Sequence, residues 1–163
     1  MIQLNSVQNP DFCILFEKCP GQYLVLLPDS QFTIVAVTDA YTRVTMTQRS
    51  DILYRGVFEV FPDNPDDPQA SGVANLTASL NRVIHEKTHD VMAVQKYDIR
   101  RPDSEGGSFE ERYWCPVNSP VLGSDNQLLY IIHRVEDVTE FIKLKQQGKE
   151  QSKMAEQMQL QSD

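Results

Sequence analysis

The spacing of apolar residues divides the chain into β-forming segments at both ends and helical segments between them. Runs rich in β-branched and aromatic residues predict strands at 22–27, 32–37, 91–100, 109–117 and 128–136. Apolar residues at helical spacing predict helices at 11–19 and 71–86, several short helical turns between 38 and 61, and a polar helix after 137. Turn-forming residues at 62–68, 102–107 and 123–126 separate these elements.

Strands at both ends of a chain with helices between them indicate an α+β fold. We therefore expect an antiparallel sheet with helices packed on one face. The 163 residues suit one domain of ordinary size with terminal extensions, and such a domain buries a core without metal or disulfide help.

Composition narrows the classes of partner. The net charge of −8 disfavours binding to nucleic acid or to anionic membranes. Cys13, Cys19 and Cys115 form no metal-ligand spacing, and no apolar run is long enough to cross a bilayer. The start of the chain lacks the pattern of a signal peptide, so we expect a reduced, cytoplasmic protein.

Three motifs occur in a characteristic order along the chain. A strand at 32–37 runs into a helix capped by Thr38 or Asp39; 49–62 fits an arginine, apolar pairs, glycine and proline at fixed spacing; and 137–140 reads Asp-Val-Thr-Glu. Together they resemble the PAS family over about residues 11–140. The stretch from Tyr97 to Pro120 is similar to a bacterial subgroup attached to histidine kinases.

The resemblance implies a five-stranded antiparallel sheet with short helices on one face that enclose a pocket. It implies an N-terminal cap segment at 1–20, a PAS core at 21–137 and a C-terminal signalling helix at 138–163. The implied function is that of a sensory module in a bacterial two-component protein, with an effector such as a histidine kinase in the same polypeptide. The alternatives are a ligand-free dimerisation scaffold and, less favoured, a haem-based gas sensor. No catalytic set of residues appears, so we do not expect an enzyme.

Candidate pocket residues come from aromatic, basic and imidazole side chains on the predicted sheet and helices. In the last strand, alternation places His133 and Arg134 on opposite faces, so one of them must face the covered side and find a hydrogen-bond partner or a ligand. Lys96, Arg112 and Trp114 either form cross-strand pairs or face a pocket. The full set of candidates is Tyr41, Met46, His85, Lys96, Tyr97, Arg112, Trp114, His133 and Arg134.

The resemblance also bears on cofactors. Haem-binding members take a histidine from the helix that holds His85, but this residue lies in a polar last turn that suits an exposed side chain. Flavin-binding members need a cysteine in a motif that none of the three cysteines matches. We expect neither haem nor flavin in the purified protein and leave open whether another small ligand binds. Asp63, Asp66 and Asp67 lack calcium-loop spacing, so no metal site is predicted.

The segment after residue 137 carries the predicted signal relay. Asp137 is expected to bind backbone or a basic residue, Thr139 to cap the helix, and Phe141 and Leu144 to begin a heptad pattern that continues with small and polar residues. Such a seam is a weak coiled coil, suited to a switch, although a frayed tail would have the same pattern. We expect a homodimer through this helix and the helix around 12–16.

Overall fold

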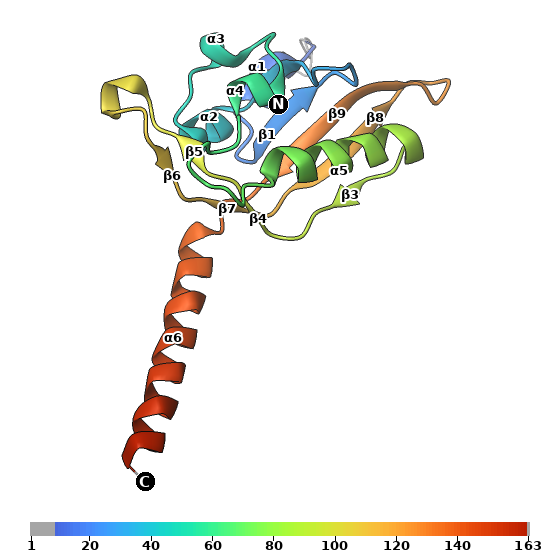
Figure 1. Cartoon of the computed structure of the whole chain (residues 1–163). Helices are drawn as coiled ribbons and strands as arrows, with labels where there is room; N and C mark the ends of the chain where they lie inside the picture. The colour runs from blue at the N-terminus through green and yellow to red at the C-terminus, as the bar shows by residue number, and fades with distance from the viewer. Residues whose placement is uncertain (1–8, 163) are drawn as a thin grey trace, which may run out of the picture.

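The computed structural model describes residues 9–162; residues 1–8 of the predicted N-terminal cap segment lie outside this range. Five strands form one antiparallel sheet in the order β2-β1-β9-β8-β3. Their bounds are β1 Gln22–Leu26, β2 Ile34–Val37, β3 Asp90–Val91, β8 Val117–Leu122 and β9 Leu128–Val135. Figure 1 shows helices covering one face of this sheet, so the predicted α+β architecture is confirmed.

The first two helices begin at a side chain that accepts a hydrogen bond from a free amide group. Asp11 caps α1 through a bond from the amide of Ile14, and Thr38 caps α2 through the amide of Tyr41. Arg49, the arginine of the second motif, donates to Asp39 Oδ1 at 2.6 Å and to the carbonyl of Val37 at 2.9 Å. The bounds are α1 Phe12–Glu17, α2 Asp39–Thr45, α3 Arg49–Ile52, α4 Val57–Val60 and α5 Gly72–Glu86.

The core lies between the sheet and these helices. β1 contributes Leu24 and Leu26, and α5 contributes one apolar face at helical spacing. The fully buried apolar residues are Leu24, Leu26, Ile34, Leu80, Val83 and Ile131, each at 0 % exposure. This burial confirms the amphipathic reading of the 71–86 helix.

The predicted strands at 91–100 and 109–117 form a more broken ribbon than expected. It consists of three short pairs: β3 with β8, β4 (Gln95–Lys96) with β7 (Tyr113–Trp114), and β5 (Ile99–Arg100) with β6 (Phe109–Glu110). Between the first two pairs, three residues at 92–94 face two at 115–116, and Pro116 has no amide hydrogen to donate. A short helical turn, η1 (Asp103–Glu105), closes the ribbon at its tip.

α6 (Thr139–Ser162) leaves the domain as a separate rod (Figure 1). Its apolar side chains stand in solvent, including Phe141 at 65 % exposure and Leu144 at 61 %. α1 lies at the other end of the domain in Figure 1, and Phe12 there is also exposed. Among the residues that the structure describes, no helix combines the length and apolarity needed to span a membrane.

Candidate functional site

A small cavity lies between the sheet and the helices α2, α4 and α5. Its volume is about 40 Å³. Its lining consists of Tyr41, Thr45, Val57, Phe61, Gly72, Leu76, Met92, Gln95, Tyr97, Ile99, Trp114, Pro116, His133 and Val135. No charged residue belongs to this lining, and the volume is that of roughly three water molecules.

Several aromatic side chains line the wall, and backbone carbonyls hold two of them in place. Trp114 Nε1 donates to the carbonyl of Tyr97 at 2.8 Å, and the Tyr97 hydroxyl donates to the carbonyl of Phe61. The ring of Tyr41 meets the rings of Phe61 and His133 edge-on, with centroids 6.0 and 6.2 Å apart. The wall is therefore fixed by specific hydrogen bonds as well as by packing.

Two polar groups at the cavity have no hydrogen-bond partner among the described residues. Gln95 is engaged at both ends of its amide, and the Thr45 hydroxyl bonds to the carbonyl of Tyr41 and to Thr47. The Tyr41 hydroxyl and His133 Nε2 are the groups that remain. Because both residues line the cavity, a bound molecule would gain hydrogen bonds at these two atoms.

His133 resolves the choice that strand alternation left open. It faces the covered side with 5 % exposure, and its Nδ1 lies 2.7 Å from Oδ1 of Asn118, its cross-strand partner on β8. Burial lowers the pKa of His133 to about 4, so the imidazole is neutral at physiological pH. Arg134 points the other way and pairs with Glu136 at 2.6 Å in solvent.

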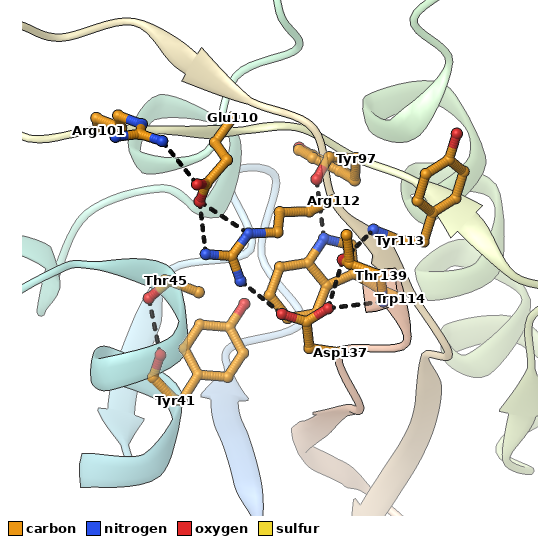
Figure 2. A network of polar contacts seen from close by, with 10 residues as sticks. All are labelled: Tyr41, Thr45, Tyr97, Arg101, Glu110, Arg112, Tyr113, Trp114, Asp137 and Thr139. Atoms are coloured by element: carbon orange, nitrogen blue, oxygen red, sulfur yellow. Dashed lines mark hydrogen bonds and ion pairs between the residues drawn. The ribbon is translucent and has the colours of Figure 1, made fainter. Parts of the chain in front are cut away.

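A second polar cluster, the junction network, holds the start of α6. Asp137 Oδ1 accepts hydrogen bonds from the amide of Thr139 at 3.0 Å and from its hydroxyl at 2.5 Å. The Thr139 hydroxyl oxygen in turn accepts the amide of Tyr113 at 2.9 Å (Figure 2). The expectation that Thr139 caps the helix is therefore wrong: Thr139 is the first residue of α6, and the carboxylate of Asp137 is the acceptor.

Arg112 completes the junction network. Its guanidinium binds Asp137 Oδ2 at 2.5 Å and Glu110 Oε2 at 2.6 Å, and Arg101 binds the other oxygen of Glu110 at 2.8 Å (Figure 2). Burial raises the pKa of Asp137, but hydrogen bonds from Thr139 and Arg112 outweigh it and leave this pKa below its usual value. An open groove of about 530 Å³ runs beside the network. It is lined by Glu110, Glu111, Arg112, Asp137, Thr139, Glu140, Lys143, Leu144 and Gln147.

The cavity and the junction network share one short strand. Trp114 of β7 lines the cavity with its indole, while its backbone pairs with Asp137. The two residues before it, Arg112 and Tyr113, bind Asp137 and Thr139 through side chain and amide. Three consecutive residues therefore connect the wall of the cavity to the first turn of α6.

The structure brings four of the nine candidate pocket residues together at the cavity. They are Tyr41, Tyr97, Trp114 and His133. Met46 ends α2 in the left-handed region and packs against the core away from the lining. Ligand contact by the four residues stays a prediction.

The basic candidates lie away from the cavity, because each binds a partner outside it. His85 is exposed and binds the carbonyl of Asn81 one turn back along α5. Lys96 binds Asp67 at 2.8 Å and Asp98 at 3.1 Å, which ties the 62–68 loop to β4. Arg112 belongs to the junction network and Arg134 to the outer face of the sheet, so neither reaches the cavity.

Sequence reasoning missed several lining residues and one buried partner. Thr45, Met92 and Gln95 line the cavity but carry no pattern that distinguishes them from ordinary helix or loop residues. Asn118 had a usable signal. A buried histidine on one strand requires a polar partner on the next, and Asn118 lies among apolar and small residues of β8.

Comparison with known proteins identifies the fold. No family model matches the chain, and no curated protein matches it. Among solved structures, it resembles an RNA-binding light-oxygen-voltage receptor with 16 % identity and a TM-score of 0.61, over 90 % of this chain and 37 % of that one. It also resembles the PAS domain of the fruit-fly ELK potassium channel with 9 % identity and a TM-score of 0.54, over 80 % and 99 %.

A third similar structure is the PAS domain of a protein from Colwellia psychrerythraea. Identity is 12 %, the TM-score is 0.57, and the match covers 78 % of this chain and 93 % of that one. The fold is that of a PAS domain. The cavity thus lies between a PAS sheet and its covering helices, and α6 is an extension beyond the final PAS strand.

The cavity does not fit the cofactors that the PAS fold suggests. At about 40 Å³ it is far below the roughly 300–1,000 Å³ of pockets that enclose ligands the size of a drug molecule. None of the three cysteines lines it: Cys13 is on α1, Cys19 follows that helix, and Cys115 lies between two lining residues without joining them. His85 is on the exposed face of α5. The described cavity is therefore small, has no cysteine in its lining and lies away from His85.

Proposed function

We propose that this chain is the sensory module of a signal-transduction protein, in which a small molecule in the cavity alters the junction network and α6 passes the change to an effector. The observation that supports it best is the position of β7. Trp114 contacts the cavity, and the same strand binds Asp137 and Thr139 at the start of α6. A molecule that displaces the indole would also move the strand that holds the helix.

The output side rests on α6. The heptad positions that begin with Phe141 and Leu144 carry no charged residue through Met158, and these three side chains are 65, 61 and 69 % exposed. Such a face is unstable alone in water, and a second copy of α6 would cover it. We propose a parallel dimer through α6 and, following the sequence resemblance, an effector such as a bacterial histidine kinase in the intact protein.

Uncharged fragments of about three to six heavy atoms, screened by NMR against the chain, test this function. Compounds that shift the Trp114 indole signal should also change hydrogen exchange at the amides of Thr139 and Ile142, which bond to Asp137 and to the Val138 carbonyl. Binding at the indole with no change at these two amides would contradict the relay.

A second candidate function is a ligand-free dimerisation scaffold, and the small volume of the cavity favours it. Native mass spectrometry of the purified protein separates the two. A dimer without added mass that binds none of the fragments would support the scaffold. An enzyme has little support, because the titratable side chains at the cavity are one histidine and two tyrosines, with no acid or nucleophile set.

A further inference from the structure

A chain of hydrogen bonds runs from the cavity to the protein surface through β9, β8, α5 and β3. His133 Nδ1 lies 2.7 Å from Asn118 Oδ1, and Asn118 Nδ2 donates to Ser79 Oγ at 2.8 Å. Ser79 Oγ donates to Asp90 Oδ2 at 2.5 Å, and Arg82 binds both oxygens of Asp90 at 2.9 and 3.1 Å. Asn118 and Ser79 have no exposed surface, so they depend on these bonds.

The carboxylate at the outer end fixes the direction of every bond in this chain. An ionised carboxylate only accepts, so the Ser79 hydroxyl must donate to Asp90 and its oxygen is left to accept from the Asn118 amide. The carbonyl oxygen of Asn118 then faces His133, which must donate from Nδ1. The Arg82 ion pair keeps Asp90 ionised, because its hydrogen bonds and those of Ser79 lower the pKa of Asp90.

The inner end of the chain reaches the cavity. A neutral imidazole carries one proton, so a proton on Nδ1 leaves Nε2 of His133 with a free lone pair. Burial keeps the ring neutral, and Nε2 has no hydrogen-bond partner among the described residues. The cavity therefore presents Nε2 of His133 as a hydrogen-bond acceptor, and Asp90 at the outer end of the hydrogen-bond chain determines this.

We propose that this row of hydrogen bonds holds His133 as the Nδ1–H tautomer. The cavity then selects uncharged molecules that carry an N–H or O–H donor. The inference rests on the proposed function, in which the cavity binds a ligand. A charged molecule would lose its hydration without meeting an opposite charge in the lining. A molecule with acceptors alone can accept from the Tyr41 hydroxyl but leaves Nε2 of His133 unpaired, whereas a molecule that also carries a donor gains a hydrogen bond at Nε2.

The tautomer is measured directly by long-range ¹H–¹⁵N NMR of histidine-labelled protein at pH 7. We expect Nδ1 of His133 to show the shift of a protonated nitrogen and Nε2 that of an unprotonated one. Protonation of Nε2, alone or together with Nδ1, would overturn the inference and leave the proposed function standing.

Replacing the carboxylate of Asp90 tests whether it sets the tautomer of His133, without changing a residue of the cavity. Asp90→Asn introduces an amide that can donate to Ser79, which lets the whole chain reverse and protonate Nε2 instead. The Nε2–H form should therefore rise in Asp90→Asn. Asp103→Asn is the matched control, since Asp103 pairs with Arg100 in the distant η1 turn and should leave the tautomer unchanged. An unchanged tautomer in Asp90→Asn would show that the carboxylate does not set it.

Acetamide and acetone test the selection. They have the same planar shape and heavy-atom number, but only acetamide has an N–H donor. In titrations followed at the Trp114 indole, the ratio of acetamide to acetone affinity should fall on the order of threefold to tenfold from wild type to Asp90→Asn, the value of one hydrogen bond. A ratio that is the same in both proteins would overturn the ligand class alone. If neither compound binds the wild-type protein, the ligand class fails, and the wider fragment screen decides the proposed function.

Discussion

Replacing Arg112 tests whether the junction network stabilises the domain. The Arg112 side chain is 18 % exposed and that of Asp137 is 20 % exposed, so this ion pair lies between a surface pair and a buried one. Surface pairs contribute about 0–1 kcal/mol, while breaking a fully buried pair costs about 3–5 kcal/mol. Because Arg112 also binds Glu110, we expect Arg112→Met to cost about 2 kcal/mol of unfolding free energy. In a domain of this size, that lowers Tm by roughly 4–8 °C.

Urea unfolding at pH 7 measures this cost, and Arg101→Met is the matched control. Arg101 binds the same Glu110 from a side chain that is 43 % exposed, so its loss should cost less than about 1 kcal/mol. A double-mutant cycle of Arg112→Met with Asp137→Asn isolates the pair and should give a coupling of about 1 kcal/mol or more.

Two results would refute the reasoning about Arg112. One is an equal effect of Arg112→Met and Arg101→Met; the other is a coupling with Asp137 that is zero within error. The pH dependence gives a further check. Because the pKa of Asp137 lies below its usual 3.8 in the folded protein, the pair should stabilise fully above pH 3.8 and lose its contribution as the pH falls further.

Three further predictions concern His133, α6 and cofactors. Since burial lowers the pKa of His133 from its usual 6.5 to about 4, the unfolded chain takes up the proton first, and stability should fall by roughly 3 kcal/mol from pH 7 to pH 4. His133→Leu should flatten this slope, and an unchanged slope would contradict the burial argument. Wild-type protein should sediment as a dimer at high micromolar concentration and Leu144→Glu as a monomer; a wild-type monomer would refute the α6 interface. The visible spectrum of the purified protein should lack flavin and haem bands, and a haem band lost in His85→Ala would contradict this expectation.

Much of the fold could be predicted because local signals agreed with the tertiary arrangement. Thr38 was one of two predicted caps for the second helix. Its hydroxyl also donates to the carbonyl of Gly21, which connects the start of α2 to the residue before β1. The apolar spacing of α5 was sufficient to predict this helix, because the pattern depends only on one face being buried. The ribbon of β3 to β7 was predicted less well, because the extra residue at 92–94 is a property of the strand pair and not of either strand alone.

The site was harder to predict because distant residues decide it. Alternation could not choose between His133 and Arg134, and the partner Asn118 on β8 makes that choice. At the junction, Asp137 and Thr139 are two residues apart and either has an oxygen that can cap. The amide of Tyr113, 26 residues away, binds the Thr139 hydroxyl, and the Asp137 side chain accepts the free amide of Thr139. Residue type alone placed Lys96 and Arg112 near a pocket. In the structure each binds a carboxylate that is distant in the sequence.

The coupling between the cavity and α6 can be tested without any ligand by adding one methyl group. A Cβ at Gly72 would lie 2.3 Å from the Tyr97 ring, so Gly72→Ala must displace this part of the wall. The backbone carbonyl of Tyr97 accepts the hydrogen bond from the Trp114 indole. We predict faster hydrogen exchange at the amides of Tyr113 and Thr139 in Gly72→Ala. Gly123→Ala, whose new Cβ meets only ordinary contacts in the β8–β9 turn, should leave both amides unchanged. Exchange at these amides that is identical in Gly72→Ala and wild type, in a protein whose Trp114 signal has moved, would contradict the account.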